Sequence, residues 1–282
     1  MIQFDAVRLS GLYDIDLPIL GASPVDPYQV SQIDGLGPPE LNVTLADTHT
    51  SGGVYVGRQA QGRQIVVLAK LNPDYLGGQT ISDLRYKVYG LLSPGLDPLD
   101  QSITFKLLQL NEPVLQTKGY IKRVEIVPFD KDPRVQITIE CLTPYLEKPE
   151  PVDLTDSIPA SYFWDFTYEG LAPSGIEFEV FFPNSINIFT IRLDDPLGNT
   201  YATMDFQGNF VANDRLVVNT NKKSRVVGVK QGEFGAFYKG VSILSGASEW
   251  ITLRGGTHRI VTNNPSEFTW IYFRYVDRYW GI

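Results

Sequence analysis

The sequence contains one cysteine, two histidines and fewer positive than negative charges. Because Cys141 is the single cysteine, no disulfide can form within the chain, and its place in the alternating segment 135–141 predicts a buried core thiol instead of a nucleophile. Neither His49 nor His258 has a Cys or His partner at metal-ligand spacing, which argues against a zinc site. A Gly-x-Ser-x-Gly elbow is also absent. We therefore expect no catalytic residues, no metal and no cofactor, and a protein that is not an enzyme.

The charge balance and the lack of long apolar runs argue against a DNA-binding protein and against a membrane-spanning protein. The 24 Lys and Arg residues against 32 Asp and Glu residues give a net charge of −8, whereas a DNA-binding surface needs clustered Lys and Arg. No apolar stretch reaches the roughly 18 residues of a membrane span. Residues 1–6 show no basic stretch followed by an apolar run, so no signal peptide is expected. We expect the chain to fold in a cytoplasm and to carry no membrane span.

What the chain does have is the composition of a β-rich protein. Its 25 glycines, 19 prolines and 12% aromatic residues favour many short strands joined by turns. The continuously apolar segment 65–69 is expected to be a strand covered on both faces. Alternating apolar and polar residues predict strands at 40–45, 134–141 and 176–181. Further strands are expected at 102–107, 120–126, 186–193, 200–206, 216–219 and 250–253, and at 267–275, which is aromatic on both faces.

One helix is predicted after the cap candidates at 80–83, from an apolar stripe formed by Leu84, Val88, Leu91 and Leu92. A single helix among many strands is expected to plug an open barrel or to flank a sheet. The acidic, proline-punctuated stretch from Thr143 to Pro159 predicts a linker, because proline stiffens the chain and is excluded from central strands. We predict an N-terminal β domain at 1–148, a linker at 149–160 and a C-terminal antiparallel β-sandwich at 161–282. The alternative is one continuous domain with a long loop.

Two functional interpretations stay open beside a purely structural one. Paired carboxylates can hydrolyse glycosides, and candidates occur in the second half at Asp194, Asp195, Asp205 and Glu249. The composition of 195–199 is, however, that of a plain turn. Aromatic residues can also stack on sugars, and Trp164, Trp250, Trp270 and Trp280 are available, together with several tyrosines near the end of the chain. A carbohydrate-binding module that contacts the host surface is therefore the alternative to aromatic side chains that serve as core and subunit contacts.

Two groups of segments carry a resemblance that covers nearly the whole chain. The first is Ile33–Glu40, followed about 25 residues later by 62–68. The second comprises 208–210, 214–220, 253–260 and 273–280. In this order, their dispersed glycines, prolines and strand patterns resemble the distal tail protein (Dit) of long-tailed bacteriophages, the siphophages.

The resemblance implies a structural virion protein at the tail tip. Its N-terminal β-barrel or sandwich, with one helix, would close a homohexameric ring between the tail tube protein and the tail-associated baseplate hub protein. DNA would pass through the lumen without specific binding, and the periphery would anchor receptor-binding proteins. The C-terminal domain would be a galectin-like sandwich. The galectin sugar motifs are missing, because His258 is not followed by Asn-Pro-Arg and no Glu follows Trp250 at the required position. Assembly is expected in the host cytoplasm.

The turn before the strand at 41–45 is the predicted partner interface. Gly35 and Gly37 permit unusual φ angles, and Pro38 and Pro39 stiffen the chain that follows. A rigid turn of this kind could hold a strand edge in position for pairing with a neighbouring subunit. The alternative is that the turn only closes a hairpin.

Overall fold

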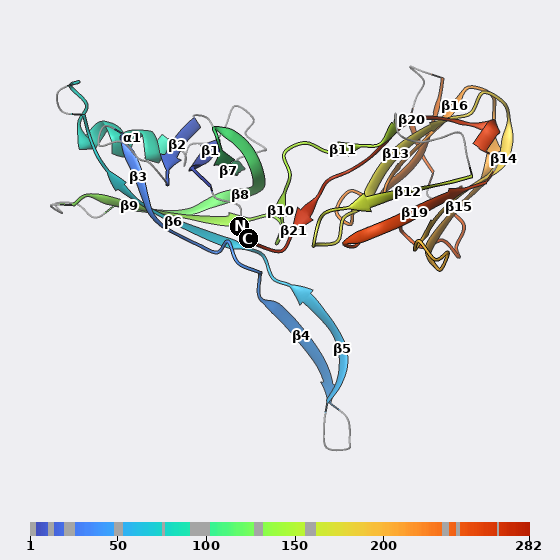
Figure 1. Cartoon of the computed structure of the whole chain (residues 1–282), viewed down its shortest axis with the longest axis horizontal. Helices are drawn as coiled ribbons and strands as arrows, with labels where there is room; N and C mark the ends of the chain where they lie inside the picture. Colours follow the sequence, from blue (N-terminus) through green and yellow to red (C-terminus); the bar gives the residue numbers. More distant parts are fainter. Residues whose placement is uncertain are drawn as a thin grey trace. The chain divides into compact units, whose positions relative to one another are not determined.

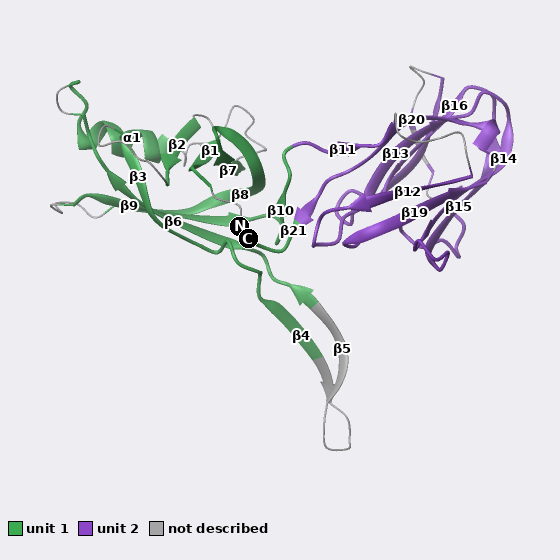
Figure 2. Cartoon of the chain, viewed as in Figure 1, with its two compact units in different colours: residues 1–149, 279–282 green, residues 150–278 purple. Residues whose placement is uncertain are grey.

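The computed structural model describes residues 4–10, 14–19, 26–47, 53–74, 77–90, 102–126, 132–155, 162–232, 237–240, 243–263 and 265–282. The fold is mainly β with one α-helix in the described ranges, which confirms the predicted class. Two compact units make up the chain (Figure 2). Unit 1 comprises residues 1–149 together with 279–282, and unit 2 comprises residues 150–278.

Unit 1 is built on a strongly curved antiparallel sheet. Its main path runs in the order β2-β1-β7-β8-β9-β6-β3, and the end strands β2 and β3 approach each other without a hydrogen-bonded ladder, which leaves an open barrel. The short strand β10 pairs with β8 and with β21. The bounds are β1 Ala6–Ser10, β2 Asp14–Pro18, β3 Tyr28–Asp34, β6 Gln64–Leu71, β7 Ile103–Gln109, β8 Glu112–Ile126, β9 Arg134–Cys141, β10 Leu146–Glu147 and β21 Arg278–Tyr279.

The predicted helix is present as α1 (Ile81–Gly90) and contributes to the core of unit 1. Thr80 and Asp83 form a reciprocal cap, in which the Asp83 amide donates to the Thr80 hydroxyl and the Thr80 amide donates to the Asp83 carboxylate, at 3.2 and 2.8 Å. Leu84 and Val88 are completely buried among the strands, and the Tyr28 hydroxyl donates to the Leu84 carbonyl. The other two stripe residues, 91 and 92, lie outside the described residues.

A two-stranded ribbon, separate from the main sheet, interrupts the path from β3 to β6. It consists of β4 (Leu41–Asp47) and β5 (Gly53–Ala60), which pair only with each other in the described structure and extend away from the curved sheet (Figure 1). The strand predicted at 40–45 is thus confirmed. The sequence pattern did not predict β3, because a register shift between Val30 and Gln32 interrupts the alternation that marks a strand.

Unit 2 is an antiparallel β-sandwich with its own core. One sheet has the order β11-β20-β13-β16-β17-β18 and the other β12-β19-β14-β15. Phe178 of the first sheet contacts the rings of Phe189 and Phe206 of the second, at centroid distances of 6.5 and 6.3 Å. The bounds are β11 Val152–Asp153, β12 Phe163–Tyr168, β13 Ile176–Phe181, β14 Ile186–Asp194, β15 Thr200–Phe210, β16 Asp214–Asn219, β17 Val226–Gln231, β18 Phe237–Lys239, β19 Gly256–Thr262 and β20 Thr269–Tyr275, with a 3-10 turn at Pro265–Glu267.

The bounds of unit 2 differ from those predicted for the C-terminal domain at both ends. Residues 150–155 of the predicted linker belong to unit 2, because β11 pairs with the end of β20. The last four residues, which the prediction gave to the C-terminal sandwich, belong to unit 1. The chain therefore passes between the units twice. The strand predicted at 250–253 is extended but forms only an isolated bridge, from Leu253 to Ser174.

Candidate functional site

The predicted partner interface forms the base of the β4–β5 ribbon. Residues 35–40 lead from β3 into β4, and residues 61–63 lead from β5 into β6. Gly35 has a φ of 86°, and a Cβ atom there would overlap the carbonyl oxygen of Gln64, so no other residue fits without a shift of the backbone. Gly37 does not have a positive φ. The predicted conformational role therefore applies to Gly35, while exposed Pro38 and half-buried Pro39 stand where the chain enters the ribbon.

Arg63 holds the base of the ribbon together. Its side chain is only 3% exposed, and its guanidinium donates to backbone carbonyls from three separate segments. Nη1 lies 2.6 Å from the Gly35 oxygen, while Nε and Nη2 lie 3.2 and 3.0 Å from the Pro144 oxygen. Nη2 also donates to the Trp280 carbonyl. Burial lowers the pKa of Arg63. Sequence reasoning missed this residue, because nothing near it in the chain marks its distant partners.

The end of the chain packs onto the same turn. The Ile282 amide donates to the Leu36 carbonyl at 3.1 Å. A Cβ atom on Gly281 would lie 2.5 Å from the carbonyl carbon of Gly37, so the two backbones approach closely. The ring of Trp280 meets that of Tyr145 edge-on at 5.0 Å. The predicted interface turn thus holds the chain's own C-terminus in this structure.

Beyond this base, the described part of the ribbon exposes apolar side chains. Leu41 and Val43 point to the same face of β4 and are 45% and 57% exposed. A two-stranded ribbon is marginally stable in water without further packing. Apolar side chains on such a ribbon are therefore a candidate contact surface.

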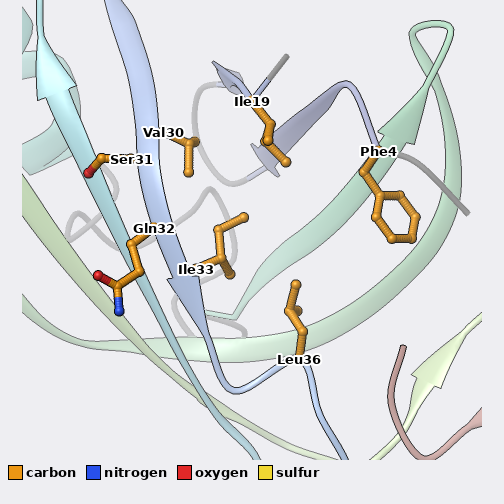
Figure 3. Close-up of a pocket in the computed structure, with 7 residues that line it drawn as sticks. All are labelled: Phe4, Ile19, Val30, Ser31, Gln32, Ile33 and Leu36. Carbon is orange, nitrogen blue, oxygen red and sulfur yellow. The ribbon is translucent and has the colours of Figure 1, made fainter. Parts of the chain in front are cut away.

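A second apolar surface lies at the open seam of the unit 1 barrel (Figure 3). Phe4, Ile19, Val30, Ile33 and Leu36 converge there around a pocket of about 340 Å³, and Ser31 and Gln32 complete its lining. Because β3 is the last strand of the sheet path, one of its edges has no strand partner in the described structure. The seam therefore combines an unpaired strand edge with apolar side chains, a combination that accepts an added strand or an apolar side chain.

The other candidate residues have local partners or lie elsewhere. Cys141 is buried, as predicted, and burial raises the pKa of its thiol to about 11. The Asp194 carboxylate is buried against the Arg192 guanidinium, and Asp195 accepts hydrogen bonds from Asn199 within a turn. His49 lies outside the described residues. Among the described residues, no cluster of three or more His, Cys, Asp or Glu side chains could hold a metal ion. No described helix is long and apolar enough to cross a membrane.

Comparison with known proteins gives matches at the level of structure. No family model and no curated protein sequence matches the chain. The crystal structure of the Dit protein of phage SPP1, a paradigm of the hub adsorption apparatus in phages that infect Gram-positive bacteria, matches with a TM-score of 0.64 at 15% identity. This match covers 96% of this chain and 98% of that chain.

Two structures of the phage p2 baseplate in its activated conformation, with Sr and with Ca, match at 12% identity with TM-scores of 0.46 and 0.45. Each match covers 97% of both chains. The comparison with SPP1 Dit spans both units, including the β-sandwich of unit 2. The chain therefore has the fold of a Dit protein over nearly its whole length, as its sequence pattern indicated.

Proposed function

We propose that this protein is a structural component of a phage tail tip, a Dit-type ring that joins the tail tube to the baseplate hub. The observation that carries the proposal is the likeness in fold to SPP1 Dit, which extends over 96% of the chain. The ring is a homohexamer assembled in the host cytoplasm. The tail tube protein contacts one face, the tail-associated hub protein contacts the other, and receptor-binding proteins attach at the periphery. The function is structural, without catalysis.

Unit 1 supplies the two different surfaces that a closed ring requires. Side-to-side contacts that close by rotation are heterologous, so one patch on each subunit meets a different patch on the next. The ribbon face with Leu41 and Val43 is one such patch, and the apolar seam beside β3 is the other. The ribbon of one subunit packs against unit 1 of its neighbour. Burial of the two apolar side chains then stabilises the contact by about 1–3 kcal/mol per side chain.

The acidic character of the chain suits a conduit for DNA. With a net charge of −8, the ring repels phosphates and does not retain the duplex as it passes. Unit 2, which has a core of its own, is the part of the chain that offers attachment surfaces to receptor-binding proteins.

Light scattering across a concentration series tests the ring. The wild-type protein should form a hexamer in exchange with monomer. The double variant Leu41→Glu, Val43→Glu places two charges in the proposed contact and should raise the half-assembly concentration at least about tenfold, as expected for a loss above about 1.4 kcal/mol. The matched control is Leu197→Glu, on an almost fully exposed side chain in a turn of unit 2. A wild-type protein that stays monomeric even with tail tube protein present would contradict the ring. Equal assembly of the double variant and the control would contradict the ribbon contact.

A further inference from the structure

Unit 2 contains a polar pocket that the tail-hub role does not use. It has a volume of about 620 Å³, within the range of small-molecule sites. It lies where the start of β15 meets the segment 249–255 and the start of β19. Its lining includes the side chains of Tyr201, Glu249, Trp250, Thr252, Arg254 and His258.

The segment before β19 presents its polar residues to the pocket because its apolar residues alternate with them. Ile251 and Leu253 are completely buried, so Trp250, Thr252 and Arg254 lie on the opposite side of the extended chain. Two backbone contacts fix the segment. The Glu249 amide donates to the Thr203 carbonyl of β15 at 2.8 Å, and Leu253 bridges to Ser174. The pocket wall is thus held in place from both ends.

The two aromatic side chains of the pocket differ in how they are packed. The Arg225 guanidinium lies over the Trp250 ring at 4.9 Å from its centroid, and Trp250 also packs against the core of unit 2. Tyr201 is 55% exposed, and its ring meets that of His258 edge-on at 6.3 Å. A half-exposed ring at the mouth of a polar pocket offers a flat apolar face to a ligand.

His258 is buried and lines the pocket. Its Nε2 lies 2.5 Å from the Arg254 carbonyl oxygen, and because a carbonyl oxygen can only accept, Nε2 donates. Within the described part of the chain, the Nδ1 of this ring has no hydrogen-bond partner. The His258 side chain is only 4% exposed, and a buried nitrogen without a partner is uncommon in folded proteins.

We propose that this pocket binds a neutral saccharide. A sugar ring has hydroxyl groups that both donate and accept, together with an apolar C–H face. The pocket matches this with the Glu249 carboxylate as acceptor, the Arg254 guanidinium as donor and the Tyr201 ring for the apolar face. The Thr252 hydroxyl donates to the Trp250 carbonyl at 3.5 Å and offers the ligand a further acceptor. One carboxylate and one guanidinium leave the pocket without a dominant charge, which disfavours phosphate and other anions. The inference goes beyond the ring and does not depend on it, because every pocket residue belongs to unit 2.

Binding to the full-length protein can be measured by saturation-transfer NMR and titration. The probes are glucose, galactose, N-acetylglucosamine and rhamnose, each up to about 10 mM, because weak sugar sites have dissociation constants near the millimolar range. Inorganic phosphate is the anionic comparison. At least one sugar should bind, and Tyr201→Ala and Arg254→Gln should each weaken it about tenfold or more. Tyr201→Phe keeps the ring face and should retain most of the affinity.

The matched control is Tyr162→Ala, which removes a tyrosine of similar exposure (61%) from unit 2 outside the pocket. It should leave the affinity for the sugar unchanged. Three results would overturn the proposal: no sugar binds, only phosphate binds, or Tyr201→Ala and Arg254→Gln bind the sugar as tightly as the control does. Circular dichroism of each variant checks that the sandwich is intact. The light-scattering test of the ring is a separate measurement on different residues, so failure of one proposal is distinguishable from failure of the other.

Discussion

Replacing Arg63 by alanine tests whether one buried side chain holds the base of the ribbon to the end of the chain. Arg63 donates to carbonyls of Gly35, Pro144 and Trp280, and the variant would leave all three without this partner. A hydrogen bond from a charged donor contributes about 1.5–3 kcal/mol. The cost of burying the guanidinium, which also lowers its pKa, offsets part of the gain, and water can enter the vacated space. We expect unit 1 to lose about 3 kcal/mol of unfolding free energy, or about 6–12 °C in Tm.

Urea unfolding followed by circular dichroism measures this loss, and hydrogen exchange locates it. Amides in 35–40, 142–145 and 279–282 should exchange faster in Arg63→Ala than in the wild type. The control is Arg8→Ala, which breaks an exposed ion pair with Asp16 and should cost less than about 1 kcal/mol. Deletion of residues 280–282 removes part of the same set of contacts as Arg63→Ala. The loss of unfolding free energy in the combined variant should therefore be smaller than the sum of the losses in the two single variants. A loss below about 1 kcal/mol for Arg63→Ala, or strict additivity with the deletion, would refute the reasoning.

Three further expectations concern the helix cap, a turn and pH. Thr80→Ala removes the cap of α1 and should lower the unfolding free energy by about 1 kcal/mol in chemical denaturation, whereas Thr252→Ala should not. Leu110 has a φ of 51° in the β7–β8 turn, so Leu110→Gly should raise Tm, with a gain of up to about 1 kcal/mol. Burial raises the pKa of the Cys141 thiol from 9.0 to about 11. The contribution of this thiol to the unfolding free energy is therefore complete below pH 9 and is lost as the pH rises from 9 to about 11. Alkylation of the thiol in the folded protein at pH 8 should be slow.

Much of the fold followed from local pattern. The alternation in 134–141 and 176–181 predicted β9 and β13, because residues two apart in a strand share a face. The helix followed from the spacing of Leu84 and Val88 and from the cap at Thr80. The same pattern led to an error at 250–253, where Ile251 and Leu253 are buried as in a strand although the segment forms only one bridge. Alternating apolar residues indicate which side chains face inward, but they do not indicate whether a neighbouring strand is present.

The candidate sites depended on contacts between distant parts of the chain. The partners of Arg63 lie 28, 81 and 217 residues away, and the pocket proposed for a saccharide joins β15 to a segment about 50 residues later. The sequence by itself determined the strand-rich class, the helix and the buried thiol, because each depends on the residue's own chemistry or on its near neighbours. It favoured Gly35 and Gly37 alike, and only the fold, which brings the Gln64 carbonyl against Gly35, separates the two. Only the tertiary structure decided that the C-terminus returns to unit 1 and that Tyr201, Glu249 and Arg254 share one pocket. The periodicity of apolar side chains indicates which face of a strand or helix is buried. Which other segment packs against that face is decided by the fold of the whole chain.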